Sequence, residues 1–143
     1  MMSHAVGLLR RSTNQPFDDV IAAAETAIRQ SGAAVLARID HGREAAAVGL
    51  ELRPTVLLMF GNPSGGTRVM QILPESAIDL PMKLLIQAGD DDRPVQIIGE
   101  DPAWIVERHG GGQDLADVVA AMRHLMQQVL AMAAQAGSTD RSA

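Results

Sequence analysis

The stretch from residue 55 to residue 72 constrains the fold of this chain more than any other. It begins with five consecutive apolar residues, Val56 to Phe60, too few for a membrane span and bounded too sharply for a long helix. This run predicts a strand covered on both faces. The chain then enters Gly61–Thr67, where three glycines, an asparagine and a proline permit a tight turn and close backbone approach. The sequence therefore predicts a buried strand that leads into a turn suited to a binding site.

The composition of the chain argues against nucleic acid as a partner. The 143 residues are 47% hydrophobic and 20% charged, as in an ordinary globular protein. Acidic residues outnumber basic ones 17 to 12, which gives a net charge of -5, and aromatic residues make up only 2%. Nucleic acid binding normally needs a basic surface or aromatic stacking platforms, so nucleic acid is not an expected partner.

The chain has no cysteine, which excludes disulfides, thiolate catalysis and cysteine-based metal sites. We find neither a signal peptide nor a run of about 18 apolar residues, so we expect no membrane association and a cytoplasmic location. The length suits one domain, which we assign to residues 1–136, with a flexible tail at residues 137–143.

Periodicity and turn residues predict strands that alternate with helices. The expected strands are residues 5–12, 34–39, 56–60, 82–87 and 95–98, the last two forming a hairpin. The expected helices begin at Phe17, at Thr67 as an N-cap, and at Ala103 after an Asp101 N-cap, and one or two helical turns are expected over residues 42–48. An apolar stripe over residues 115–133 predicts a packed terminal helix.

The glycine turn resembles a phosphate-binding loop only in part. Gly61 and Gly66 have the right spacing, but Thr67 stands where that loop needs a lysine, which argues against nucleotide hydrolysis. Ser64 lacks the flanking glycines of a hydrolase nucleophile because Asn62 occupies one of the two positions. A plain glycine corner and an amide-lined site for a carboxylate or small phosphate both remain open.

The histidines and methionines provide the other candidate chemistry. The four histidines form no pair at metal-ligand spacing on a helix, so no metal site is predicted. His41 follows Asp40 at a strand end, and His109 follows Glu107 at a helix end, where each histidine is either an acid-base group or a hydrogen-bonding cap. Eight methionines suit core packing, and ligation of haem or a metal by His and Met is the alternative.

Several motifs together resemble the domain-of-unknown-function 302 family over roughly residues 5–136. They are Ile39-Asp40-His41, the run from Gly49 to Thr55, Phe60-Gly61-Asn62-Pro63, Gly66-Thr67, Met70-Gln71, Asp79-Leu80-Pro81, Asp101-Pro102 and Glu107-Arg108-His109. The resemblance implies an α+β fold of the TATA-binding-protein-like kind, with an antiparallel sheet of four to five strands packed by two main helices and short helical turns. It also implies a homodimer, and it implies no established reaction.

These observations lead to three hypotheses about function. The first is a dimeric ligand-binding or regulatory module that holds a small anionic or amphipathic molecule. Its pocket would be formed by Gly61, Asn62, Ser64, Gly65, Gly66 and Thr67, with Asp40, His41 and His109 nearby. The second is an enzyme that uses His41 or His109 as the acid-base group and Asp101 or Glu107 to orient it. The third is a haem- or metal-binding protein, and the sequence specifies no cofactor.

Overall fold

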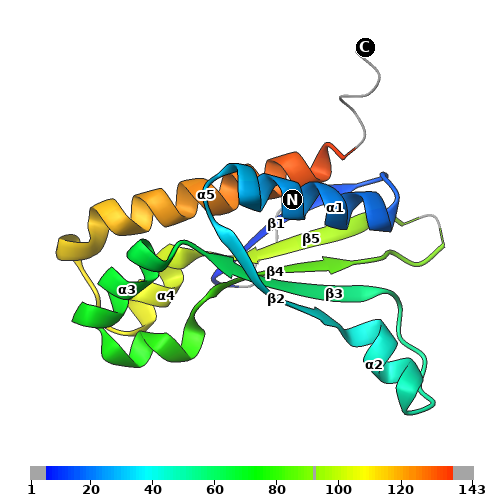
Figure 1. Cartoon of the computed structure of the whole chain (residues 1–143), viewed down its shortest axis with the longest axis horizontal. Coiled ribbons are helices and arrows are strands. Elements are labelled where there is room, and N and C mark those ends of the chain that lie inside the picture. Colours follow the sequence, from blue (N-terminus) through cyan, green and yellow to red (C-terminus); the bar gives the residue numbers. More distant parts are fainter. Residues whose placement is uncertain (1–5, 92, 137–143) are drawn as a thin grey trace.

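The computed structural model describes residues 6–91 and 93–136. Strands and helices follow one another along the chain (Figure 1). The strands are β1 (Leu8–Thr13), β2 (Ala34–Asp40), β3 (Thr55–Gly61), β4 (Met82–Gln87) and β5 (Val95–Glu100). The α-helices are α1 (Phe17–Gln30), α2 (His41–Ala47), α3 (Pro63–Ile72), α4 (Pro102–Arg108) and α5 (Ala116–Ala134), and the 3₁₀ helices are η1 (Pro74–Asp79) and η2 (Gln113–Leu115).

The strands form one antiparallel sheet in the order β1-β5-β4-β3-β2. The predicted hairpin is confirmed, because β4 and β5 pair with Leu85 opposite Ile98. The predicted α+β class with an antiparallel sheet is confirmed as well. The terminal 137–143 segment lies outside the described residues, so the domain bounds stay a prediction.

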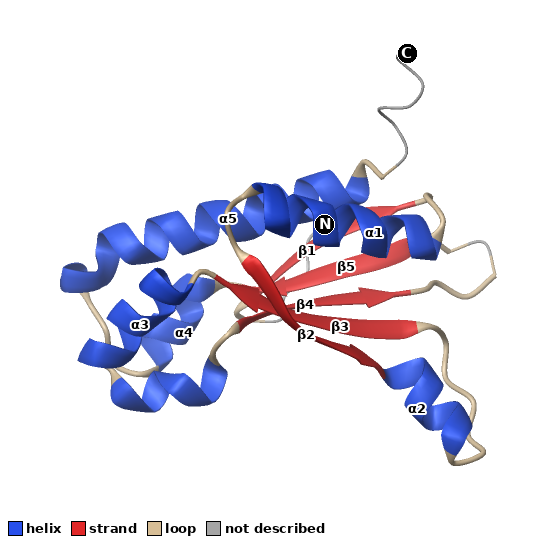
Figure 2. Cartoon of the chain, in the orientation of Figure 1, coloured by secondary structure: helices blue, strands red, loops and turns tan. Residues whose placement is uncertain are grey.

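Helices α1 and α5 cover only one face of the sheet (Figure 2). Along β3, Val56, Leu58 and Phe60 are buried, whereas Leu57 and Met59 on the other face remain partly exposed. The prediction that this strand is covered on both faces is therefore wrong. In an antiparallel sheet alternate residues point to opposite faces, and one face can stay uncovered even when the sequence reads as a continuous apolar run.

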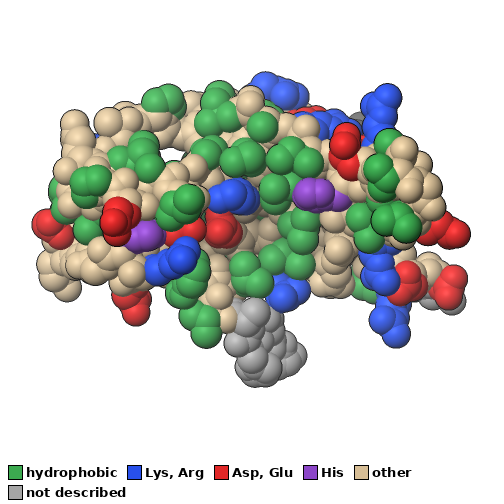
Figure 3. Space-filling model, turned by 90° about the horizontal axis from the view of Figure 1, so that it is seen from below, with side chains coloured by type: hydrophobic (Ala, Val, Ile, Leu, Met, Phe, Trp, Pro, Cys, Tyr) green, Lys and Arg blue, Asp and Glu red, His purple; other side chains and the backbone are tan. Residues whose placement is uncertain are grey.

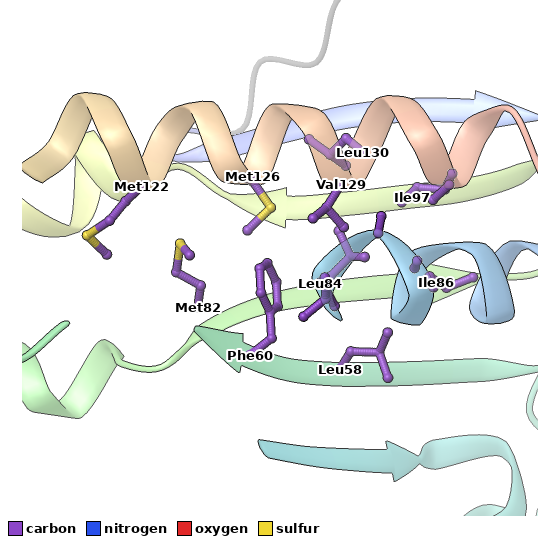
Figure 4. Close-up of a cluster of buried hydrophobic side chains, with 14 of the residues drawn as sticks. Leu58, Phe60, Met82, Leu84, Ile86, Ile97, Met122, Met126, Val129 and Leu130 are labelled. Atoms are coloured by element: carbon purple, nitrogen blue, oxygen red, sulfur yellow. The ribbon is translucent and has the colours of Figure 1, made fainter. Parts of the chain in front are cut away.

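The core lies between the covered face and the two long helices (Figure 4). Alternate residues of the central strands contribute Leu58, Phe60, Leu84 and Ile86, all with no exposed surface. The predicted stripe on the terminal helix supplies the opposing side chains, including Met126, Val129 and Leu130. Gly99 of β5 lies directly under Met126, where a larger residue would collide with the methionine side chain.

Helix α3 begins earlier than the sequence predicted. The expected N-cap was Thr67, but Asn62 takes that place, and Pro63 occupies the first helical position. The side chain of Asn62 accepts hydrogen bonds from the amide of Ser64 at 3.0 Å and from its hydroxyl at 2.8 Å. A capping asparagine followed by proline overrides the low helix propensity of the two glycines, so the predicted turn is the first turn of a helix.

Leu84→Ala tests the one-sided core. It removes a fully buried side chain, so we expect it to lower the free energy of unfolding by about 3 kcal/mol in urea denaturation. The control is Leu85→Ala, the next residue on the same strand, which faces the partly exposed side and, at concentrations where the chain is monomeric, should cost less than half as much. Equal losses for the two variants would contradict the assignment of faces.

Candidate functional site

A cleft of about 690 Å³ lies between α3 and α5 at the end of β3. The residues of the predicted pocket that line it are Gly61, Asn62, Ser64, Gly65, Gly66 and Thr67. The other lining residues are Ser31, Leu36, Pro63, Arg68, Met70, Leu80, Pro81, Met82, Asp117, Val118, Ala121, Met122, His124, Leu125 and Gln128. Four separate parts of the chain, within residues 31–36, 61–70, 80–82 and 117–128, therefore supply its walls.

The cleft arises from the unequal lengths of the long helix and the strands. With 19 residues, α5 is about 28 Å long, whereas strands of six or seven residues span about 20 to 23 Å. The C-terminal half of α5 packs over the sheet beside α1, and its N-terminal half extends past the sheet above α3 (Figure 1). The two glycines of α3 have no side chains that could fill the cleft: a Cβ at Gly65 would just touch Met122, at 3.8 Å, and a Cβ at Gly66 would meet nothing within 4 Å.

The cleft has an apolar floor and a polar rim. Met82 and Met122, both buried, come from β4 and α5 and lie at its inner end (Figure 4). Leu36, the extra residue of a bulge in β2, adds an apolar side chain that is 58% exposed. Arg68 and His124 are exposed lining residues with no ion-pair partner among the described residues. The cleft can thus accept an apolar body and a polar or charged end.

The amides of Ser64, Gly65 and Gly66 are not available to a ligand. The Ser64 amide donates to the Asn62 side chain, and the amides of Gly65 and Gly66 donate to the Asn62 carbonyl at 3.1 and 3.3 Å. The expected amide-lined site for an anion is therefore wrong as a mechanism, because the N-cap satisfies the first amides of α3. A bound anion would have to use side chains of the rim.

Two of the predicted pocket residues lie elsewhere. In the β2–β3 pairing Asp40 is opposite Val56, whereas Gly61 at the other end of β3 is opposite Ala34. Asp40 and the exposed His41 are therefore at the far end of the sheet from the cleft, and the expectation that they converge on the turn is wrong. Asp40 instead caps α2, accepting a hydrogen bond from the Arg43 amide at 2.9 Å.

His109 also lies outside the cleft, in a second polar site at the junction of η1 and α4. Its Nε2 is 2.7 Å from Oδ2 of Asp79, and both side chains are 12% exposed. Arg108 donates to both carboxylate oxygens of Asp79 at 2.9 Å, and its guanidinium lies 5.6 Å from the centre of the Trp104 ring. The carboxylate of Asp79 is thus held by two neighbouring residues at the end of α4.

The electrostatics of this site favour an ionised Asp79. Burial raises the pKa of Asp79, but the hydrogen bond to His109 and the charge of Arg108 outweigh burial, so the pKa lies below the ordinary 3.8. Nearby, burial raises the pKa of Glu100, a rise that the ammonium group of Lys83 at 3.4 Å only partly offsets. Lys83 also donates to the backbone carbonyl of Asp79 at 3.1 Å, which ties the Glu100 carboxylate to the backbone at the end of η1.

The predicted orienting residues have other roles. Asp101 caps α4 as predicted, accepting from the Ala103 amide at 3.0 Å, and pairs with Arg123 at 3.2 Å. Glu107 is exposed on α4. The assignment of either one as the partner of His109 is wrong, because Asp79 occupies that position. Ser76, three residues before Asp79 on η1, has a buried hydroxyl without a hydrogen-bond partner in the described part of the chain.

Sequence reasoning missed the residues that long-range packing brings in. Asp79 is 30 residues from His109, and no local pattern connects them. No local pattern singles out His124 either, which lies on the exposed side of α5 that also forms the cleft rim. The apolar stripe of α5 predicts core packing along the whole helix. Met122 and Leu125 line the cleft instead because they lie on the part of α5 that extends past the sheet.

The comparisons with known proteins place this chain in a family. The model of the family described as "Domain of unknown function DUF302" matches residues 9–133. The chain belongs to the DUF302 family. A crystal structure of an uncharacterized conserved DUF302 protein from Bacillus stearothermophilus has the same fold, with a TM-score of 0.78 at 20% identity, covering 90% of this chain and 99% of that one.

Two curated relatives have a higher sequence identity to this chain than the Bacillus protein has, but only over part of their length. Proteins named fluoride-specific ion channel FluC 1 from Brucella suis biovar 1 (strain 1330) and Brucella abortus biovar 1 (strain 9-941) are each 34% identical over 116 residues, 81% of this chain. The match spans only 45% and 43% of those proteins, less than half of each. Among the described residues of this DUF302 protein, no helix is long and apolar enough to cross a membrane.

Asp79→Asn tests the second polar site. The lowered pKa of Asp79 means that its ionic contacts stabilise the fold above pH 3.8, and that this stability is lost as the pH falls through the lowered value. We expect the variant to unfold about 2 kcal/mol more easily than wild type near neutral pH, because charged hydrogen bonds are lost. In urea titrations the difference should shrink below pH 3.8, and a difference that stays constant down to strongly acidic pH would contradict the assignment.

Proposed function

We propose that this DUF302 protein is a ligand-binding or regulatory module whose cleft between α3 and α5 holds a small amphipathic molecule with an anionic group. The observation that carries the proposal is the cleft itself, with buried methionines at one end and Arg68 on its rim. An apolar pocket with a few polar groups is the usual form of a small-molecule site. The proposal keeps two expectations from the sequence, a homodimer and a cytoplasmic location.

The apolar floor favours an amphipathic ligand over a small inorganic anion. Met70, Met82 and Met122 supply flexible side chains that adapt to differently shaped apolar ligands. Arg68 has no acidic partner among the described residues and is free to pair with a carboxylate or phosphate. Asp117 on the same rim disfavours a ligand with more than one negative charge.

A thermal-shift titration with octanoate and octanol tests this proposal. Ligand at about 100 times its Kd adds about 2.7 kcal/mol to the stability, which for a chain of this size raises the melting temperature by several degrees. We expect Ala121→Trp, an exposed position that lines the cleft, to abolish the shift by filling the cleft. Ala120→Trp is the matched control, because this neighbouring exposed residue of α5 does not line the cleft and its variant should retain the shift.

The polar end of the ligand is tested in the same titration. Arg68→Gln should weaken the response to octanoate and leave the response to octanol unchanged, since only the carboxylate pairs with the guanidinium. Absence of any shift across a series of carboxylates and phosphates, or equal shifts in the Ala121→Trp and Ala120→Trp variants, would contradict a ligand site in this cleft. Haem belongs in the series, since His124 and three methionines line the cleft, and a new absorption band on mixing would favour the haem alternative.

The contact between His109 and Asp79 favours acid-base catalysis as a second candidate function. A carboxylate 2.7 Å from one ring nitrogen orients the imidazole, and the side chain is nearly buried. The buried, unpartnered hydroxyl of Ser76 lies on the same 3₁₀ helix as Asp79. This pair replaces the one predicted from sequence, with Asp79 in the orienting role.

A panel of chromogenic ester, lactone and phosphate substrates tests this second candidate. Turnover that falls at least about 100-fold in both His109→Gln and Asp79→Asn, and persists in His41→Gln, is the result expected of a general base and its orienting residue. His41 is the control because it is exposed at the far end of the sheet. Turnover that is absent from wild type, or unaffected by His109→Gln, would argue against catalysis of these reactions.

A further inference from the structure

We propose that a second copy of this chain docks on the uncovered face of the sheet, and that residues 41–54 of each copy, called the arm here, reach across to the β1 edge of the other. This deepens the homodimer of the proposed function by assigning its surface. It does not depend on the cleft, which lies at the other end of the sheet from the arm.

The uncovered face carries an apolar row across four strands. The strand pairings place Ile39, Leu57, Leu85 and Ile98 side by side from β2 to β5. One neighbouring row holds Met59 with the Lys83–Glu100 pair, and the other holds Gln87 and Gln96. Seen from this side, apolar side chains gather over the sheet between charged ones (Figure 3). An apolar centre with a polar margin is the pattern of a protein interface.

The arm has an apolar tip that is not covered by any residue in the described part of its own chain. None of the residues of α2 is buried, and each residue from 46 to 54 is exposed. Val48 is 72% exposed, Leu50 65% and Leu52 48%, which places three large apolar side chains within five residues. Scattered exposed apolar residues are common, but a contiguous group on a projecting element indicates a contact surface.

The base of the arm is fixed in place by contacts to the sheet. Arg53 pairs with Asp90 of the β4–β5 loop at 2.6 Å, and the Ala88 amide donates to the Pro54 carbonyl at 2.9 Å. Asp40 caps α2, and Gly49, at a φ of +78°, reverses the chain after the helix. The arm therefore projects from the end of the sheet on the side away from α1 and α5 with a defined shape (Figure 1). A fixed shape lowers the entropy lost on docking.

The area that a stable interface buries favours a second copy that contacts both the sheet face and the arm. Five strands about 4.8 Å apart and about 20 Å long present a projected area of about 400 Å². Stable interfaces bury about 800 Å² on each partner, so the sheet face alone supplies about half of that area. The arm adds its exposed apolar tip to the same side of the molecule, and it is the element that completes a surface of the required size.

Charge also favours a second copy. Of the charged residues of the arm, Arg53 is paired with Asp90, whereas Arg43, Glu44 and Glu51 are exposed without an ion-pair partner among the described residues. At the opposite edge of the sheet, β1 carries the exposed Arg10 and Arg11, also without acidic partners in that part of the chain. When two copies face each other about a two-fold axis parallel to the strands, β2 of one lies over β1 of the other. That arrangement brings Glu44 and Glu51 of each arm to the basic β1 edge of the other copy.

Sedimentation velocity on wild type and Leu50→Glu tests the proposal. We expect wild type to sediment as a dimer of about twice 15.2 kDa at micromolar concentration, and Leu50→Glu to raise the dimer Kd at least about 100-fold, because it places a charge in the apolar contact. Met132→Glu is the control, since this residue is 40% exposed on α5 in the helical layer, and its variant should stay dimeric. Circular dichroism melting checks that both variants are folded.

Charge-reversal variants test whether the arm of one copy contacts the β1 edge of the other. Glu51→Arg should weaken the dimer about 10-fold, and the added Arg10→Glu should restore it, as expected for a charge pair between copies. A monomeric wild type, a Leu50→Glu variant as dimeric as wild type, or a double variant weaker than either single one would overturn the proposal. The octanoate titration on the monomeric Leu50→Glu protein separates the two accounts, since the cleft should still bind when the dimer is lost.

Discussion

The structure depends on the one-sided covering of a five-stranded antiparallel sheet by α1 and α5. Burial of Leu58, Phe60, Leu84 and Ile86 against these helices supplies the core. Each helix covers one stripe, so two helices can enclose only one face of a sheet this wide. The opposite face, with its apolar row, and the cleft beneath the overhanging part of α5 are both consequences of this arrangement.

At each end of the sheet, a helix-capping residue that directly follows a strand determines where the next helix begins. At one end, Asn62 and Pro63 start α3 immediately after β3, and the glycines that follow keep α3 from filling the space under α5. At the other end, Asp40 starts α2 immediately after β2, and the chain projects before it returns at Thr55. A capping residue after a strand therefore leads to the cleft at one end of the sheet and to the arm at the other.

The sequence predicted the elements well because their signals are local. The alternation and turn residues of the β4–β5 hairpin, the Asp101 cap and the stripe of α5 each depend on neighbours within a few residues. The sites were predicted less well. Asp40 and Gly61 were placed together although antiparallel pairing puts them at opposite ends of the sheet, and Asp79 went unrecognised because its partner His109 is distant in sequence. Helix α3 begins before the predicted Thr67 because the Asn62 cap and Pro63 outweigh the low helix propensity of Gly65 and Gly66.

A crystal structure of the full chain, purified without added ligand, tests the central claim most directly, since it shows whether the space beneath the overhang of α5 is a binding site. The account predicts electron density for an elongated molecule beside Asn62, with its apolar part against Met122 and its polar end at Arg68. A structure in which side chains of α3 and α5 close the space beside Gly66 and leave no cleft would contradict it.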